Sequence, residues 1–244
     1  IDGDFFPAPL DQLIRNAKPK PIMAGVTKEE GILMIAGKKP TEEDLNEIIS
    51  LAIHDSREKK KLADEIKSAY FADGIPDNRS DFMRRIANIA SDYWFNGAVA
   101  EMCRNTVALQ DDPVYLYVFE HFNPATMGLM GKILPIQDAT HCGELPYLFK
   151  KSLFANPSFT EDDKHVMDIF TTAVMNFAKH GNPNGSTVDN NDLSVRWKPL
   201  DKQNPSRNFV FTSTQPFMNE RFFEGRPVKF MELVRKHHAN IENR

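Results

Sequence analysis

Cysteine is scarce in this chain of 244 residues, which has only Cys103 and Cys142. Two thiols are too few for the disulfide framework that holds small secreted scaffolds together. Long apolar runs are also absent, since no stretch approaches the roughly 20 residues of a membrane span. Basic charge is not in excess, because 30 Lys and Arg face 34 Asp and Glu, a net charge of −4. A protein that binds phosphate backbones usually carries a basic excess, so we expect no nucleic acid partner.

Motifs of nucleotide and metal chemistry are missing as well. The sequence has no Gly-x-Gly-x-x-Gly, no phosphate-binding glycine loop, no His-Glu-x-x-His and no Cys-x-x-Cys. We therefore expect no metal and no organic cofactor. Gly-x-Ser-x-Gly, which places a nucleophilic serine on a sharp turn, is absent too. The chain begins at Ile1 without a basic and apolar leader, and we interpret it as a segment of a longer protein.

Apolar residues are arranged as in an α/β protein. They make up 41% of the chain, beside 26% charged residues, which is typical of a globular domain. The apolar runs 20–27 and 114–119 predict strands buried on both faces, as in a parallel sheet. Further patterns predict a strand at 208–211, a loop at about 123–140, and helices from Thr41 to about 52, over about 57–71, about 79–109, from Thr160 to about 180, and over 226–238. Strands separated by long helices predict a mostly parallel sheet flanked by helices.

Acidic and imidazole side chains follow the first two predicted strands. Glu29 and Glu30 come just after the first strand, and His141 lies in the loop beyond the second. In open parallel sheets, functional groups gather in loops at the carboxyl ends of the strands. A carboxylate there can accept the Nδ1 proton of an imidazole and stabilise its charged form. Taken alone, this pattern is weak, because surface acids and loop histidines without such a role are more common.

Five motifs then occur in one order along the chain. They are Asp2-Gly-Asp-Phe-Phe-Pro7, Gly25-Val-Thr-Lys-Glu-Glu-Gly31, Thr140-His-Cys-Gly-Glu-Leu-Pro-Tyr-Leu-Phe149, Phe177-Ala-Lys-His-Gly-Asn-Pro-Asn184 and Trp197-Lys-Pro. Together they resemble the C-terminal part of the type-B carboxylesterases, the cholinesterase-like branch of the α/β-hydrolases. An invertebrate gut esterase is the closer match that they favour. The resemblance covers nearly the whole chain and implies that residues 1–244 form the C-terminal portion of one α/β-hydrolase domain.

The resemblance also implies a function and its residues. The intact protein would hydrolyse small carboxylic esters through an acyl-enzyme. Glu30, directly before Gly31, matches the triad acid, and His141 matches the general base; we expect them within about 2.6–3.2 Å of each other. Glu144 and Glu29 match supporting acids. The family's serine and oxyanion-hole glycines belong to an N-terminal half that this sequence lacks, so we expect the chain to be inactive alone and to associate with that half.

Departures from the family pattern leave alternatives open. Cys142 stands where many relatives have glycine and could form a Cys–His nucleophile pair with His141, although a spectator thiol is the simpler interpretation. Leu33 and Met34 replace aromatic residues of the cholinesterase gorge, which favours a broader substrate pocket than one for choline esters. The main rival function is an esterase-like adhesion or scaffold domain that has lost the serine. Retention of Glu30 and His141 favours the enzyme, and a stand-alone interaction module is a third, weaker interpretation.

Two further expectations concern the location and the oligomeric state of the protein. Asn78-Arg-Ser80 and Asn184-Gly-Ser186 match the N-glycosylation sequon and weakly support a secretory location, in the ER lumen or outside the cell. In cholinesterase relatives the C-terminal helices pack between subunits, so a homodimer is also expected.

Overall fold

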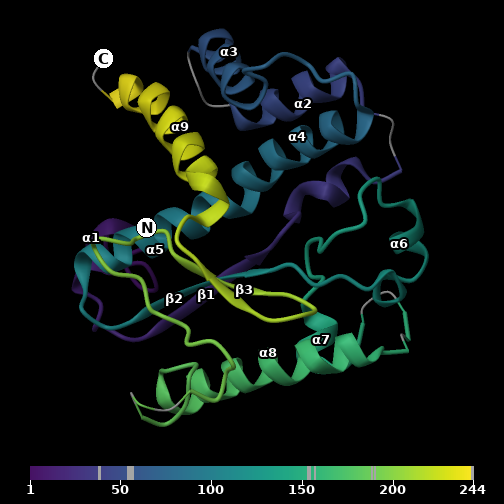
Figure 1. Cartoon of the computed structure of the whole chain (residues 1–244). Coiled ribbons are helices and arrows are strands. Elements are labelled where there is room, and N and C mark those ends of the chain that lie inside the picture. The colour runs from purple at the N-terminus through teal and green to yellow at the C-terminus, as the bar shows by residue number, and fades with distance from the viewer. Residues whose placement is uncertain are drawn as a thin grey trace.

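The computed structural model describes residues 1–37, 40–53, 58–152, 155–156, 158–187, 189 and 191–242 (Figure 1). Its strands are β1 (Ile22–Thr27), β2 (Val114–Phe119), β3 (Asn208–Phe211) and β4 (Phe217–Asn219). Its α-helices are α1 (Leu10–Asn16), α2 (Glu42–Ala52), α3 (Lys59–Tyr70), α4 (Arg79–Ser91), α5 (Gly97–Leu109), α6 (Leu129–Ile133), α7 (Leu145–Phe149), α8 (Glu161–His180) and α9 (Arg226–Glu242). Three short 3₁₀ helices, η1 (Glu30–Ile35), η3 (Pro124–Met127) and η4 (Phe222–Gly225), and one π-helical turn, η2 (Asp92–Asn96), complete the elements of this part of the chain.

The four strands form one sheet in the order β1–β2–β3–β4. The first three are parallel, with Gly25 opposite Tyr117 and Tyr117 opposite Phe209. β4 runs antiparallel beside β3. The predicted mostly parallel sheet flanked by helices is therefore confirmed. β4 has no counterpart in the sequence analysis, because three residues are too few to show a period.

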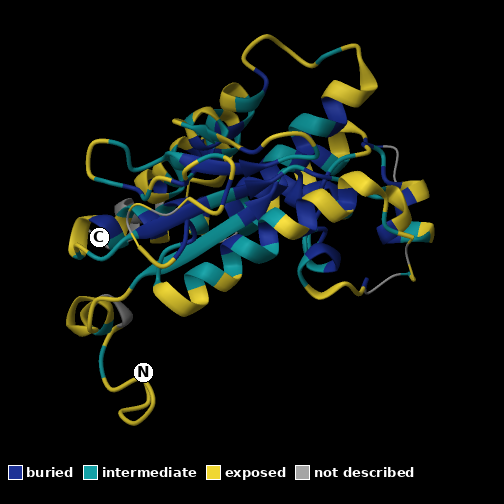
Figure 2. Ribbon diagram, turned by 60° about the horizontal axis from the view of Figure 1, so that its bottom comes forward, coloured by how far each residue is buried: buried dark blue, intermediate teal, exposed yellow. Residues whose placement is uncertain are grey.

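Two apolar layers lie on opposite faces of this sheet, because successive side chains of a strand point to opposite sides. Val114, Leu116 and Val118 of β2 belong to the cluster that contains α5. Tyr115 and Phe119 belong to the cluster that contains α8. Figure 1 shows α5 and α8 on opposite sides of the strands. In Figure 2 the strands run through the buried centre, and the outer faces of the helices are exposed.

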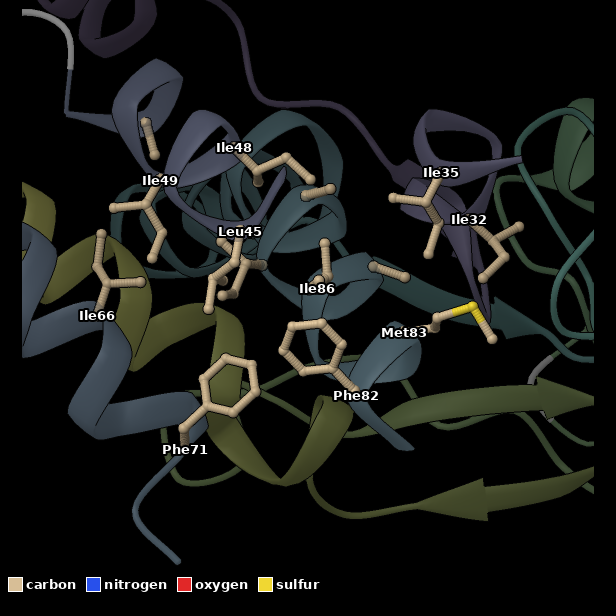
Figure 3. Packing of buried hydrophobic residues seen from close by; sticks show 14 of the residues in the cluster. Ile32, Ile35, Leu45, Ile48, Ile49, Ile66, Phe71, Phe82, Met83 and Ile86 are labelled. Carbon is tan, nitrogen blue, oxygen red and sulfur yellow. The ribbon is translucent and has the colours of Figure 1, made fainter. Parts of the chain in front are cut away.

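A third apolar cluster holds the segment that follows β1. Ile32 and Ile35 of η1 share this cluster with Leu45 of α2 and Ile86 of α4 (Figure 3). Phe230 of α9 belongs to the same cluster. Ile32 is 0% exposed and Ile35 is 1% exposed. η1 begins at Glu30, so this cluster fixes where the acid following β1 lies.

The predicted helix starts at Thr41 and Thr160 are confirmed. Each threonine hydroxyl accepts the backbone N–H of an aspartate three residues later, Asp44 or Asp163, and each aspartate side chain accepts the N–H of its threonine. Gly181 ends α8 in the left-handed conformation, with φ of 66°.

Other predicted elements need correction. The helix expected over about 79–109 is continuous but irregular, because the π-helical turn η2 lies between α4 and α5. The expected loop at about 123–140 contains η3 and α6, since short helical turns carry too few residues for a pattern. Position 57, where the next helix was expected to begin, lies outside the described residues. Within the described residues, no helix is both long and apolar enough to cross a bilayer.

Candidate active site

Glu30 lies where β1 turns into η1. The Gly31 N–H donates to Ser91 Oγ over 2.8 Å, and the Ser91 hydroxyl donates to the Ala87 carbonyl over 2.8 Å, so α4 holds this segment. The Glu30 side chain folds back toward the strand, and its Oε1 accepts the Thr27 N–H over 2.7 Å. One carboxylate oxygen is thus fixed by the end of β1, and the other is left for a second partner.

That second partner is His141. A short pairing of two segments brings it there, since the Glu29 N–H donates to the Ala139 carbonyl over 2.8 Å and Glu29 forms a parallel bridge with Thr140. His141 Nδ1 then lies 2.7 Å from Glu30 Oε2, although the two residues are 111 positions apart. The structure therefore brings together the two residues that the resemblance to the carboxylesterases pairs.

The geometry of this pair is that of a base oriented by a carboxylate. The Glu30 side chain is 7% exposed, whereas that of His141 is 42% exposed. An Nδ1–H that donates to Glu30 leaves Nε2 as the unprotonated nitrogen, which is the tautomer that accepts a proton. Because Glu30 is shielded from water, its charge acts strongly on a neighbouring imidazolium. The arrangement can take a proton from a hydroxyl group and stabilise the cation that forms.

Phe95 covers one side of this imidazole. The two ring centroids lie 4.5 Å apart, and the ring planes are 33° from parallel. Phe95 belongs to the π-helical turn η2, and such turns occur often at functional sites. The sequence pattern does not indicate a role for Phe95, because residues 79–109 have the apolar spacing of one regular helix and nothing in that spacing marks the extra residue of a π-turn.

Glu29 points away from His141 toward α4. Its Oε1 accepts a hydrogen bond from Arg84, whose guanidinium also lies 3.7 Å from Asp138 Oδ2. Glu29 is 3% exposed. Burial raises the pKa of its carboxyl group, and the Arg84 charge opposes that rise. The expected supporting role of Glu29 thus corresponds to an ion pair beside the site.

Glu144 lies near the pair without a hydrogen bond to it. Burial, together with the nearby charge of Glu30, raises the pKa of Glu144, while the His141 charge opposes the rise. Its Oε2 is buried and has no hydrogen-bond partner among the described residues, and the same holds for Thr27 Oγ1 and Thr140 Oγ1.

Cys142 has the wrong surroundings for a nucleophile. Partial burial and the negative charges of Glu144 and Glu30 raise the pKa of its thiol, which disfavours the thiolate. Its backbone adopts a positive φ of 62°, so the chain turns sharply directly after His141. The structure favours a spectator thiol over a Cys–His pair.

Leu33 and Met34, the predicted pocket residues, lie on η1 directly after Glu30 and Gly31. Leu33 is partly buried against the apolar cluster around Ile32. Met34 is 40% exposed. Their role in lining a substrate pocket stays a prediction.

The two sequons lie in different surroundings. Asn78 is exposed and caps the N-terminus of α4, where its Oδ1 accepts the Ser80 N–H over 2.8 Å. Asn184 is 2% exposed, and its amide bonds the Trp197 backbone at both N–H and carbonyl, over 2.7 and 2.9 Å. A glycan on Asn184 would break these bonds in the folded chain, so we retain the prediction of glycosylation for Asn78 alone.

Comparison with known proteins agrees with this geometry. The carboxylesterase family model matches residues 1–230. Esterase cest-33 of Caenorhabditis elegans is 32% identical over 240 residues, which cover 96% of this chain and 42% of that protein. Gut esterase 1 of Caenorhabditis briggsae is 26% identical over 261 residues, with 97% of this chain and 44% of that protein covered. Human bile salt-activated lipase is 25% identical over 219 residues, with 84% and 27% covered. The chain thus spans less than half the length of these relatives, and it belongs to the carboxylesterase family, whose fold is that of the α/β-hydrolases.

Proposed function

We propose that this chain supplies the acid and the base of a serine carboxylesterase, with Glu30 and His141 as the second and third members of the catalytic triad. The contact of 2.7 Å between Glu30 Oε2 and His141 Nδ1 carries the proposal. The order acid and then histidine along the chain is that of the α/β-hydrolases.

The proposed reaction follows from the proton that each group holds. A serine in a preceding part of the polypeptide attacks the carbonyl carbon of a carboxylic ester, and His141 Nε2 takes the hydroxyl proton. Glu30 keeps the Nδ1 proton in place and stabilises the imidazolium. His141 returns the proton to the leaving alcohol, and an acyl-enzyme remains. Water then attacks the acyl carbon, and His141 takes its proton. As the acyl C–O bond breaks, His141 gives that proton to the serine oxygen, which releases the carboxylic acid and restores the serine.

We further propose that residues 1–244 form the C-terminal portion of one hydrolase domain. Relatives extend well beyond this chain, since it covers 42% of esterase cest-33. β1 is an outer strand of the described sheet, so one of its edges has no neighbouring strand among the described residues. An apolar strand with a free edge pairs readily with another strand. The missing half of the domain, with the serine and the oxyanion hole, fits this edge.

The hydrolysis of 4-nitrophenyl esters by the full-length protein tests the catalytic proposal. We expect His141→Ala and Glu30→Gln each to lower kcat by about 10³-fold or more, as for other catalytic triads. His165→Ala is the matched control, because His165 lies on the exposed surface of α8 and contacts only the Thr214 carbonyl in the described hydrogen bonds, over 3.0 Å. Full activity of His141→Ala would refute the assignment.

The same experiment separates the enzyme from its rival. An esterase-like scaffold would show no turnover in the full-length protein and no covalent labelling by a fluorophosphonate, which reacts with activated serines. The isolated chain should show no hydrolysis above the imidazole background. A burst of product from the isolated chain that is lost in His141→Ala would reveal a nucleophile within these residues, and Cys142→Ser would be the first control.

A further inference from the structure

A second set of charged groups lies directly behind the Glu30–His141 pair. Glu29, the residue before Glu30, accepts a hydrogen bond from Arg84 of α4. The same guanidinium lies 3.7 Å from Asp138 Oδ2, three residues before His141. Arg84 is therefore in contact with both segments that carry the pair.

Lys28 makes a second ion-pair contact with Asp138, on the segment that carries His141. Its Nζ lies 3.4 Å from Asp138 Oδ2 and 3.4 Å from Glu120 Oε2, just after β2. The two cations and three carboxylates form one network that joins the end of β1, the end of β2, the His141 segment and α4. The network is partly shielded, since the Asp138 side chain is 15% exposed and that of Glu29 is 4% exposed.

Backbone contacts between the two segments are few. Among the described residues they consist of the Glu29 N–H bond to the Ala139 carbonyl and one isolated bridge between Glu29 and Thr140. A single bridge does not define a register as a full strand pair does. The ion pairs of Arg84 and Lys28 therefore contribute strongly to the relative position of the segment with Glu30 and the segment with His141.

We propose that Arg84 is a positioning residue, which holds the acid segment and the histidine segment in the register that gives the Glu30–His141 contact. This inference rests on the catalytic role proposed for that pair. One guanidinium nitrogen, Arg84 Nη1, makes both contacts, so a single cation neutralises a carboxylate of each segment at once. Glu29 also needs a cation nearby, since an unpaired buried carboxylate is costly.

Removing Arg84 should act on catalysis through His141. Without the cation, Glu29 takes up a proton or turns toward water, and the Glu29–Thr140 bridge loosens. The groups that interact with His141 are the carboxylates of Glu30 and Glu144 and the Phe95 ring. A longer Glu30–His141 distance weakens the main stabilisation of the imidazolium, so the acidic limb of the kcat/KM profile should shift to lower pH.

The test uses the full-length protein and steady-state kinetics with a 4-nitrophenyl ester over a range of pH. We expect Arg84→Met to lower kcat by about 10-fold, with KM changed less than about twofold, because the loss falls on the transition state. Arg84→Lys should recover part of the loss. Arg85→Met is the matched control, since Arg85 is the next residue of α4 and pairs instead with the exposed Asp73. It should keep the kcat and the pH profile of the wild-type protein.

A double-mutant cycle with Glu29→Gln separates positioning from general stability. In the Glu29→Gln background Arg84 keeps Asp138 but has no carboxylate partner on the acid segment, so it no longer joins the two segments and Arg84→Met should lower kcat by much less than 10-fold. Equal effects in both backgrounds would overturn the proposal. So would an Arg84→Met protein that melts earlier than Arg85→Met but keeps kcat and pH profile. If Arg84→Met does not fold, the same comparison is made with Arg84→Lys, in the wild-type and in the Glu29→Gln background. A loss of kcat that is equal in both backgrounds would again overturn the proposal. Failure of the catalytic proposal is recognised separately, by an active His141→Ala protein.

Discussion

Replacing Gly31 with alanine tests how tightly the segment after β1 is held. A Cβ at this position would collide with the Ala87 carbonyl and would lie 2.7 Å from the Ser91 nitrogen and 2.8 Å from the Ala90 Cβ. Two of these three atoms belong to the backbone of α4, so no side chain can rotate away to make room. The segment must move away from α4, which stretches the Gly31 N–H···Ser91 Oγ bond of 2.8 Å.

The expected cost has two parts. Overpacking a tight site costs about 1–3 kcal/mol. Weakening a buried hydrogen bond adds about 1–2 kcal/mol. Gly31→Ala should therefore lower the free energy of unfolding by about 3 kcal/mol, a large part of the roughly 5–15 kcal/mol of an ordinary domain. Because Glu30 moves with its neighbour, esterase activity should fall more than the loss of folded protein explains.

Urea denaturation of the full-length protein, followed by circular dichroism, measures the first effect, and ester hydrolysis below the unfolding transition measures the second. Gly74→Ala is the matched control. Gly74 has a φ of 90°, but no atom lies within 4 Å of its added Cβ. That variant should lose about 1 kcal/mol from backbone strain alone and keep full activity. A Gly31→Ala protein as stable and active as Gly74→Ala would refute the idea that α4 fixes the acid.

Four further predictions concern charge, packing and assembly. Glu144→Gln should lower the pKa of the Cys142 thiol, because one of the negative charges that raise this pKa is removed. The thiol should then react faster with a thiol reagent at pH 8, and an unchanged rate would contradict this. Burial raises the pKa of the Asp163 carboxyl group, but hydrogen bonds from His121 and Thr160 outweigh it and lower this pKa. The ionised Asp163 therefore stabilises the folded chain above its unfolded pKa of about 4, and this stabilisation is lost as the pH falls through the folded pKa. Asp163→Asn should therefore cost about 3 kcal/mol at pH 7 and less in acid, as denaturation at both pH values would show. Phe95→Ala should lower kcat about 10-fold, because the His141 ring loses the contact that limits its orientation. Phe95→Leu should recover part of the lost kcat, and stopped-flow or steady-state ester hydrolysis measures both variants. The isolated chain should associate through the free edge of β1, and a cooperatively folding monomer in size-exclusion chromatography with light scattering would argue against that.

Local chemistry made several elements predictable from the sequence. The starts of α2 and α8 depend on a threonine and an aspartate three residues later, so all the interacting groups lie within one turn. β2 is recognisable because six consecutive apolar or aromatic residues suit a strand covered on both faces. The five motifs in order indicated the family, which the match over residues 1–230 confirms.

The site itself was predictable only in part. The positions of Glu30 and His141 after two parallel strands, together with the family motifs, pointed to this pair. Their contact across 111 residues depends on the packing of η1 against α4 and on the pairing of Glu29 with Thr140. Sequence spacing carries no measure of such distances.

Tertiary structure alone identified Phe95 and Arg84. Phe95 reaches the imidazole because a π-helical turn shifts its direction, and no residue pattern marks that turn. Arg84 is an ordinary charged residue of an amphipathic helix until Glu29 and Asp138 are brought beside it. The sequence by itself determined the local elements and the types of reacting groups, because those depend on neighbours along the chain. The distances and the surrounding charges depend on contacts between remote segments, and only the folded chain decided them.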